Sequence, residues 1–384
     1  MTAAVFLAVA CIAPFTSSTH VAATAASEAS VAQVVEPLMK RYGIPGMAVG
    51  IVVDGREYIY DFGVASMGTR QPVDVDTLFE IGSVTKTFTA ALASYAEITG
   101  KLSLADDASA YLPELRGSGF DRVTLLELGT HTSGGLPLQL PDEVKSDADA
   151  MRYFEHWVPL HEPGTSRTYS NPSIMLLGLI AAKSMGGDFS ALVQRTIFAP
   201  LGLKHTYLDV PAQAMEHYAQ GYTSSDQPIR LTRGPLAAEA YGVRTTAGDL
   251  LRFLEANIDA TAAGGTLARA LAASHTGYFR IGAMTQALMW EQYACPAALD
   301  TLLAGNSDRM LFDANPAARI EPPISPGDDV LLDKTGSTNG FAAYVAFVPR
   351  ERLGVVLLAN KSYPIAARVT AAYRILSNAV AGPR

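Results

Sequence analysis

The segment "LFEIGSVTKTF", residues 78–88, places Ser83 three residues before Lys86. Residues three apart on a helix share one face, so the lysine amine would lie one turn from the serine hydroxyl. A serine hydroxyl attacks nothing at neutral pH without an adjacent base or a strong positive field. A buried lysine with a lowered pKa can supply either. The alternative is an ordinary helix start capped by the serine, and the pair alone does not decide.

A second group of polar residues lies in "RTYSNPS", residues 167–173. Asn171, followed by Pro172, fits the N-cap of the apolar helix that comes next. Alternatively, Tyr169 carries protons and Asn171 offers its amide to a lysine and to a substrate carbonyl. Lowering a phenol pKa from about 10 to about 7 requires roughly 4 kcal/mol. Two lysine ammonium groups in a closed cleft could supply that energy, whereas one exposed lysine could not.

The third group is "DKTGSTNGF", residues 333–341, directly before an apolar strand. Lys334 and Thr335 have the donors to bind a carboxylate. Gly336 lacks the Cβ atom that would keep a substrate away from the backbone, and the backbone N–H of Ser337 could point at an oxyanion. The alternative is a polar hairpin strand with a solvated lysine.

Hydrophobic periodicity indicates which elements position these groups. Near the N-terminus it predicts one helix and then two strands joined by an Asp54-Gly55 turn, and near the C-terminus two strands and a final helix. The predicted elements cover residues 30–43, 46–55 and 56–65, and then 340–349, 353–360 and 366–379.

The middle of the chain is helical in pattern, for example over residues 88–100, 173–187 and 247–258. We therefore expect an α/β (α+β) fold of two lobes, in which both termini build one antiparallel sheet flanked by helices. The expected sheet lobe comprises 27–95 and 305–384. The expected helical lobe with its active-site loops is 96–304, and the active site lies between the lobes.

Composition limits the possible partners. The net charge of −8 argues against nucleic acid or an anionic membrane as a partner. Residues 1–26 begin with an uncharged apolar run and continue with small polar residues, which is typical of a secretory signal although no Lys or Arg precedes the run. Removal of that segment leaves Cys295 as the only cysteine, so no internal disulfide is expected.

Together, and in this order, the three groups resemble those of the serine β-lactamase and penicillin-binding protein superfamily. Tyr169-Ser170-Asn171 is similar to the pattern of the class C (cephalosporinase) branch. Other segments, from about residue 42 to residue 376, also resemble class C sequences. They include "YGIPGMAVGIVVDG", "THTSGGLPLQLPDEV", "AEAYGVRTTAGDL" and "GFAAYVAFVPRERLGVVLLANKSYP".

The resemblance implies hydrolysis of a β-lactam amide through a covalent acyl-enzyme, without metal or other cofactor, by a periplasmic monomer. It implies that Ser83 is the nucleophile, that Lys86 and Tyr169 relay the proton, and that Lys334 biases Tyr169 towards phenolate. The implied oxyanion hole consists of the N–H groups of Ser83 and Ser337. The implied substrate-binding residues are Gln139, Asn171, Tyr241, Thr335, Gly336 and Ser337.

Some positions depart from the class C pattern. Asp333 stands where histidine is common, and its carboxylate is expected to stabilise the charge of Lys334. Ser362 and Ile365 stand where asparagine is common, so recognition of a carboxylate is expected to depend on Lys334, Thr335 and Arg368. Glu291, in "MWEQY", is expected to support the site from behind.

Other functions fit the sequence less well. An esterase or a D-alanyl-D-alanine peptidase would need the same acylating residues and would differ in how fast the acyl-enzyme is hydrolysed and in what the cleft admits. The segment from Gly135 to Gln139 and the "AEAYGV" loop favour the lactamase, because esterase relatives usually keep only the core motifs. A catalytically silent peptidoglycan-binding protein would be expected to have lost Lys86, Tyr169 or Lys334. The seven histidines form no ligand-like cluster for zinc, and no Gly-x-Ser-x-Gly elbow is present.

Overall fold

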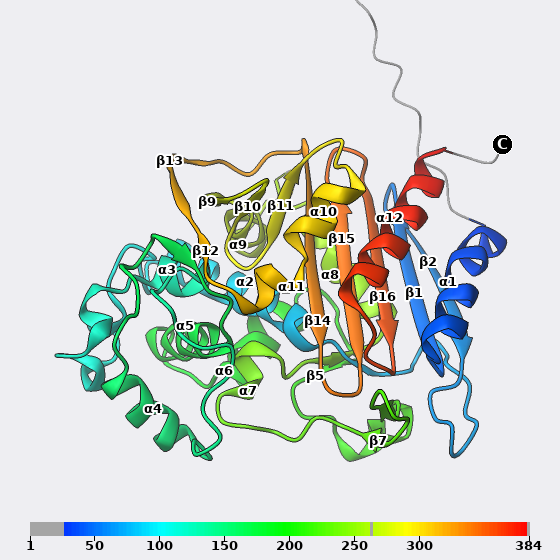
Figure 1. Ribbon diagram of the computed structural model, residues 1–384, viewed down its shortest axis with the longest axis horizontal. Helices are drawn as coiled ribbons and strands as arrows, with labels where there is room; N and C mark the ends of the chain where they lie inside the picture. The colour runs from blue at the N-terminus through cyan, green and yellow to red at the C-terminus, as the bar shows by residue number, and fades with distance from the viewer. Residues whose placement is uncertain (1–26, 262–263, 382–384) are drawn as a thin grey trace, which may run out of the picture.

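The computed structural model describes residues 27–261 and 264–381. The predicted secretory segment, residues 1–26, lies outside the described residues. Within them, one large antiparallel sheet stands beside a mainly helical region (Figure 1).

The large sheet has nine strands in the order β13-β9-β10-β11-β14-β15-β16-β1-β2. Strands from both ends of the chain are therefore neighbours, as predicted, and β1 pairs with β16. The sheet also takes β9, β10 and β11 from within residues 96–304, the segment expected to be the helical lobe. The strands are β1 (Gly46–Val53), β2 (Arg56–Gly63), β9 (Gly277–Ile281), β10 (Met284–Gln286), β11 (Glu291–Ala294), β13 (Ala318–Ile324), β14 (Val330–Ser337), β15 (Ala342–Val348) and β16 (Leu353–Ala359).

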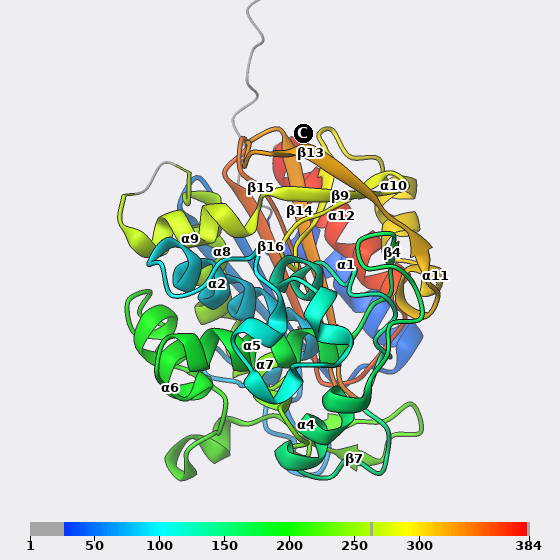
Figure 2. The same ribbon diagram turned by 90° about the vertical axis from the view of Figure 1, so that its left-hand side faces the viewer.

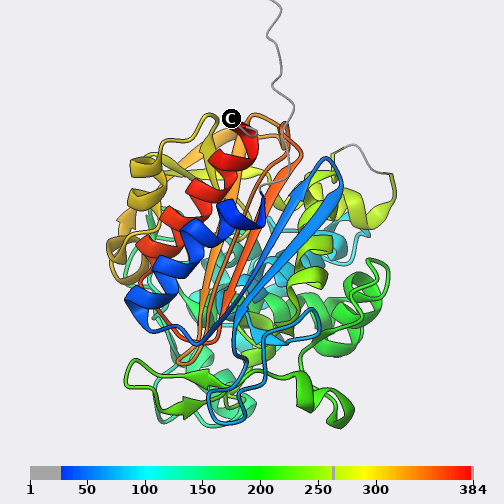
Figure 3. The ribbon, with the colours of Figure 1, turned by 90° about the vertical axis from the view of Figure 1, so that its right-hand side faces the viewer.

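Both faces of this sheet are covered. In β1, Met47 and Val49 pack with Val35 of α1 (Glu28–Tyr42) and with residues of α12 (Ile365–Ala381), the two helices on the face seen in Figure 3. Val52 faces the other way, into the core that contains α8 (Ala247–Ile258). Since successive strand residues point to opposite faces, burial on both faces explains the unbroken apolar sequence of β1.

The helical region is built around α2 (Thr85–Ile98) and α5 (Asn171–Ser184), which contact each other inside the larger core (Figure 2). The positions of these two helices matter for the site because α2 follows Ser83 along the chain and α5 follows Tyr169. The remaining helices are α3 (Leu125–Gly129), α4 (Asp147–His156), α6 (Phe189–Val193), α7 (Ala237–Ala240), α9 (Thr266–Ser274), α10 (Leu299–Gly305) and α11 (Asp308–Phe312). Short strands are β3 (Phe79–Glu80), β4 (Ser166–Arg167), β5 (Thr206–Tyr207), β6 (Gly221–Tyr222), β7 (Pro228–Ile229), β8 (Arg244–Thr245) and β12 (Asn315–Pro316).

No single helix in residues 27–261 and 264–381 has the length and apolar character to span a membrane, although the bent pair 171–184 and 189–198 meets those two criteria together. No group of three or more His, Cys, Asp or Glu side chains in these ranges is arranged to hold a metal ion.

Candidate active site

Ser83 lies in a single 3₁₀ turn, Gly82–Val84, that leads directly into α2. No side chain caps either the turn or the helix, so Ser83 is not a helix cap. Its Oγ instead accepts a hydrogen bond of 2.9 Å from Nζ of Lys86, which also donates to the carbonyl of Ala240 at 2.9 Å. Lys86 is fully buried, so its amine is held in place below the serine hydroxyl.

The end of β14 approaches this turn so closely that two glycines are needed. A Cβ atom on Gly336 would lie 1.9 Å from the carbonyl oxygen of Ile81, and one on Gly82 would lie 2.6 Å from the backbone N of Ser337. Gly82 also has φ +50°, which favours glycine. The expected reason for Gly336 was access for a substrate. The structure gives a different one, which is contact between the strand and the turn that carries Ser83.

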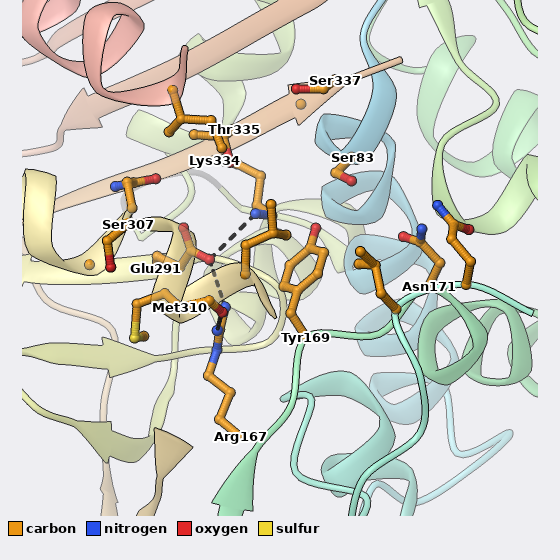
Figure 4. Close-up of a pocket in the computed structure, with 17 residues that line it drawn as sticks. Ser83, Arg167, Tyr169, Asn171, Glu291, Ser307, Met310, Lys334, Thr335 and Ser337 are labelled. Atoms are coloured by element: carbon orange, nitrogen blue, oxygen red, sulfur yellow. Dashed lines mark hydrogen bonds and ion pairs between the residues drawn. The ribbon is translucent and has the colours of Figure 1, made fainter. Parts of the chain in front are cut away.

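Tyr169 lies between two lysines. Its ring centroid is 5.4 Å from Nζ of Lys86 and 5.1 Å from Nζ of Lys334. In Figure 4 the phenol oxygen points into the space between Lys334 and Ser83. Burial alone raises the pKa of Tyr169, but the charges of Lys334 and Lys86 outweigh burial and bring that pKa below its usual value of about 10.

The two lysines respond differently to the same buried environment. Burial lowers the pKa of Lys86 to about 8, and the neighbouring Tyr169 offsets this only in part. Burial also acts on Lys334, but the carboxylate of Glu291, 3.4 Å from its Nζ, raises the pKa of Lys334 above the ordinary value. Lys334 therefore keeps its charge at neutral pH, while Lys86 is poised to lose a proton.

Arg167 is a third buried cation at the site, and sequence reasoning missed it. Its guanidinium carbon lies 5.4 Å from the Tyr169 ring, and it pairs with Glu291 at 2.9 Å. It also donates to Gln286 and to the carbonyl of Met310. Glu291 thus bridges Arg167 and Lys334, as the dashed lines in Figure 4 show. Arginine two residues before the tyrosine was the available signal.

The N-cap of α5 is Ser170, not Asn171. The Ser170 hydroxyl accepts from the backbone N of Ser173, while Asn171 occupies the first helical position. Asn171 is 4% exposed, and among the described residues its Oδ1 has no hydrogen-bond partner. Because Ser170 takes the capping role, the amide of Asn171 is left to face the cavity.

His131 packs against Tyr169 with ring centroids 4.3 Å apart. Its Nδ1 accepts from the backbone N of Ser170 at 3.2 Å. Burial, together with the nearby cations led by Arg167, lowers the pKa of His131 well below its usual value, so the ring is neutral. The residue supports the tyrosine from a turn, in which its own φ is +61°.

These groups surround one cavity of about 160 Å³. Most of the residues expected at the site line it, but Lys86, Tyr241 and Arg368 do not. Tyr241 follows Ala240, whose carbonyl holds Lys86, and is the C-cap of α7. The lining residues are Ser83, Leu138, Gln139, Arg167, Tyr169, Asn171, Glu291, Gly305, Asn306, Ser307, Met310, Leu311, Lys334, Thr335, Gly336, Ser337 and Ile365.

Arg368 was expected to help bind a substrate carboxylate, but its guanidinium is buried and occupied. It donates to the carbonyl of Gly336 at 2.6 Å, to Oγ of Ser337 at 2.8 Å and to the carbonyl of Tyr363. Arg368 is 1% exposed. It therefore fixes the end of β14 from behind rather than facing the cavity.

Asp333 was expected to sustain the charge of Lys334, and it does raise the pKa of that lysine, but Glu291 raises it more. Burial, with the charge of Glu291, raises the pKa of Asp333 to about 8, so the group is mostly an uncharged acid at neutral pH. Its Oδ2 accepts from Tyr344 and from Asn306, each at 2.8 Å. Glu291 supplies the negative charge beside Lys334, and Asp333 ties β14 to the end of α10.

The wall formed by the end of α10 and by α11 was not predicted. It contributes Gly305, Asn306, Ser307, Met310 and Leu311 to the cavity. These side chains carry no charge and no spacing typical of catalysis, so nothing in the sequence separates them from an ordinary helix connection. Only the contact of α10 with β11 and the hydrogen bond from Asn306 to Asp333 of β14 bring this wall to the cavity.

Comparison with known proteins places this fold and site in a family. The Beta-lactamase family pattern matches residues 31–379. The beta-lactamase of Lysobacter lactamgenus is 49% identical over 357 residues, covering 93% of each chain. A class C beta-lactamase in complex with cefoxitin superposes with a TM-score of 0.88 at 48% identity, covering 91% of this chain and 98% of that one.

A third relative is named as a carboxypeptidase rather than as a β-lactamase. The structure of the D-alanine carboxypeptidase AmpC from Burkholderia cenocepacia has a TM-score of 0.87 and 54% identity, and covers 91% of this chain and 98% of its own. The chain belongs to the Beta-lactamase family, and its similarity to solved class C enzymes places it in the class C branch.

Replacement of Gly336 by alanine should separate β14 from the serine-bearing turn, because the new Cβ would meet the Ile81 carbonyl at 1.9 Å. We expect at least a tenfold loss of kcat/KM and a loss of about 1–3 kcal/mol in the free energy of unfolding. Gly327→Ala is the matched control, since its nearest neighbour would lie at 3.9 Å. Equal activity of the two variants would contradict the argument.

Asp333→Asn should remove a pH-dependent loss of stability. The pKa of Asp333 is raised in the folded protein, so the stability this group contributes is present at about pH 4 and is lost as pH rises through about 8. The variant should therefore gain stability relative to the wild type between about pH 5 and about pH 9. Urea unfolding at several pH values measures this, with exposed Asp142→Asn as control. Parallel curves for the wild type and Asp333→Asn would refute it.

Proposed function

We propose that this chain is a β-lactamase that hydrolyses the amide of cephalosporins and penicillins through a covalent acyl-enzyme on Ser83. The observation that carries this proposal is the hydroxyl of Ser83, 2.9 Å from the fully buried amine of Lys86. Tyr169 adds a second proton site, and Lys334 adds a fixed positive charge. The relatives named beta-lactamase and the structure in complex with cefoxitin support the proposal.

Acylation begins when Ser83 loses its proton to Lys86 or Tyr169 and its oxygen attacks the lactam carbonyl carbon. Because the pKa values of Lys86 and Tyr169 are both lowered, a deprotonated form of either is accessible near neutral pH. The two groups titrate as a coupled set, so the base is assigned to the pair. The lactam C–N bond then breaks and the ring nitrogen receives the proton. A water next attacks the ester, activated by Tyr169 or by that ring nitrogen.

The end of β14 would stabilise charge on the substrate. The N–H groups of Ser83 and Ser337 form the oxyanion hole, on two backbones that approach closely at Gly336. Lys334 and Thr335 bind the carboxylate. Since these donors are held before the substrate arrives, little reorganisation is needed as charge develops.

The opposite wall would recognise the rest of the substrate. Asn171 and Gln139 line the cavity and bind the amide side chain. Tyr241 lies outside the lining of this cavity, next to the carbonyl that holds Lys86, and would contact the part of the substrate that extends beyond the cavity. Glu291 and Arg368 act without touching substrate, the first by pairing with Lys334 and Arg167 and the second by fixing the β14 end.

The site would lie between two lobes, a sheet lobe formed by 27–95 and 305–384 and a mainly helical lobe formed by 96–304. Strands β9 to β11 extend the second segment into the sheet. The scheme uses no cofactor and no metal. We propose that the enzyme acts as a monomer on small β-lactams, without a nucleic-acid or stable membrane partner.

We also propose that the enzyme is secreted to the periplasm and confers resistance to β-lactam antibiotics. The proposal rests on residues 1–26, whose apolar run and small residues are typical of a secretory signal. Periplasmic hydrolysis would remove the antibiotic before it reaches the cell-wall enzymes that it inhibits.

A D-alanine carboxypeptidase activity is the second candidate, favoured by the 54% identical structure that bears that name. The acylation chemistry would be the same, with release of D-alanine in place of ring opening. The two activities differ in how fast water hydrolyses the acyl-enzyme and in which substrates the cavity admits.

The mature protein should hydrolyse a chromogenic cephalosporin and should carry one covalent adduct on Ser83 after treatment with a slow β-lactam. Intact-mass spectrometry and peptide mapping detect the adduct, and Ser83→Ala should show neither adduct nor turnover. A panel of cephalosporin, penicillin, simple ester and D-Ala-D-Ala peptide separates the two candidate activities and an esterase. Full activity of Ser83→Ala, or an adduct elsewhere, would refute the proposal.

Lys334→Gln should lower kcat/KM by about 10²–10⁴-fold and displace the pH profile to higher pH. The charge of Lys334 lowers the pKa values of both Tyr169 and Lys86, so its removal raises both, whichever of them is the base. Exposed Lys204→Gln is the charge-matched control. The profile is measured as kcat/KM from about pH 5 to about pH 10, and an unshifted profile would argue against this role of Lys334.

A further inference from the structure

A second cavity lies beside α7, the helix whose last carbonyl accepts a hydrogen bond from Lys86. It measures about 190 Å³ and is enclosed by α5, α6 and α7, which contact one another. Figure 1 shows these three helices side by side in the helical region. Its apolar wall includes Leu179, Ala182 and Phe189. Engineered cavities of about 150 Å³ accept a molecule the size of benzene, so this one has room for a small organic ligand.

The lining of this cavity includes a carboxyl group with one oxygen that lacks a partner. Glu239 is 6% exposed, and among residues 27–261 and 264–381 its Oε2 makes no hydrogen bond. The side chain passes over α5 at Gly178, where a Cβ would lie 2.6 Å from Cγ of Glu239. Burying a carboxyl oxygen without a hydrogen-bond donor costs free energy, and a donor on a bound ligand would remove that cost.

The charges around the cavity favour a cation. Asp147 and Asp188 line the cavity with Glu239. The two cationic side chains on the lining pair with acids elsewhere, Lys183 with Glu114 at 3.4 Å and Arg233 with Asp209 at 3.0 Å. Three carboxyl groups thus line the cavity, against two cations that each also pair with an acid outside it.

We infer that the cavity between α5, α6 and α7 is a second ligand site, and that it binds a small primary ammonium ion with an apolar body. The ammonium would donate to Oε2 of Glu239, and the apolar body would contact Leu179, Ala182 and Phe189. A metal ion fits less well, since no metal-holding group was found among the described residues.

The site is linked by backbone to the catalytic lysine. The carbonyl of Glu239 accepts from Thr89 at 2.5 Å, and the carbonyl of Ala240, the next residue, accepts from Lys86. A ligand on Glu239 therefore orders the same four-residue helix, α7, that fixes Lys86. Its cavity nevertheless shares no lining residue with the active-site cavity, so the ligand would not compete with substrate.

Binding should depend on pH in a defined direction. Burial raises the pKa of Glu239 to about 7; Asp147 and Asp188 add to the rise, and the backbone N–H of Glu239 and Arg233 oppose it. Lys183 is the other charged group on the lining. A cation stabilises the ionised form, so its affinity should rise about tenfold from about pH 6 to about pH 8, with proton release at the lower pH.

The test is isothermal titration calorimetry of the mature protein with benzylamine, which is protonated over this range, against uncharged benzyl alcohol. We expect saturable binding of benzylamine only, weakened at least tenfold by Glu239→Gln and retained in Ser83→Ala. Exposed Asp142→Asn is the matched control for loss of a carboxylate. Thermal unfolding checks that each variant is folded. If Glu239→Gln does not fold, the pH dependence of benzylamine binding to the wild type tests the proposal instead.

Three outcomes would overturn the proposal: no binding, equal binding of benzyl alcohol, or competition of benzylamine with a chromogenic cephalosporin. The calorimetric arm needs no turnover, so failure of the β-lactamase proposal and failure of this one give different results. Noncompetitive behaviour with a measurable change in kcat would support the link from Glu239 to Lys86.

Discussion

The site depends on one close approach of two backbones, the end of β14 and the turn that carries Ser83. Both Gly336 and Gly82 lack the Cβ atoms that would prevent this contact. The contact joins the sheet to α2, because the turn continues directly into that helix. Arg368 secures the strand end from behind. The positions of Ser83 and Ser337 relative to each other therefore follow from two missing side chains and one buried guanidinium.

Electrostatics then act on a geometry that is already fixed. Three buried cations, Lys86, Lys334 and Arg167, surround the Tyr169 ring, and one carboxylate, Glu291, is shared between two of them. The two lysines of this cluster differ in pKa because their neighbours differ. Lys334 keeps its proton because Glu291 is beside it, whereas Lys86 has no carboxylate partner and burial dominates its pKa. The same residue type thus supplies a permanent charge at one place and a titrating amine at another.

Much of the fold followed from the sequence, since period-2 and helical patterns are local properties of the chain. The terminal strands, their Asp54-Gly55 turn and the flanking helices agree with the structure. What the sequence could not supply was set by contacts between distant segments. Asn171 looked like a helix cap until Ser170 was found in that role, and Arg368 looked like a carboxylate ligand until its donors were found engaged. Patterns identify groups capable of chemistry, and packing decides which groups remain free.

The same distinction applies to Asp333 and Glu239, two buried carboxyl groups with raised pKa values. Asp333 accepts hydrogen bonds from Tyr344 and Asn306 at Oδ2, which lower its pKa, but burial and the charge of Glu291 outweigh them, and its Oδ1 has no partner among the described residues. Glu239 has an oxygen without a partner among the described residues and faces a cavity. Burial raises a carboxyl pKa in both cases, so the shift itself does not indicate function. The difference lies in the surroundings, because Glu239 lines a cavity beside the helix that fixes Lys86, whereas Asp333 lies in β14 between the paired strands β11 and β15.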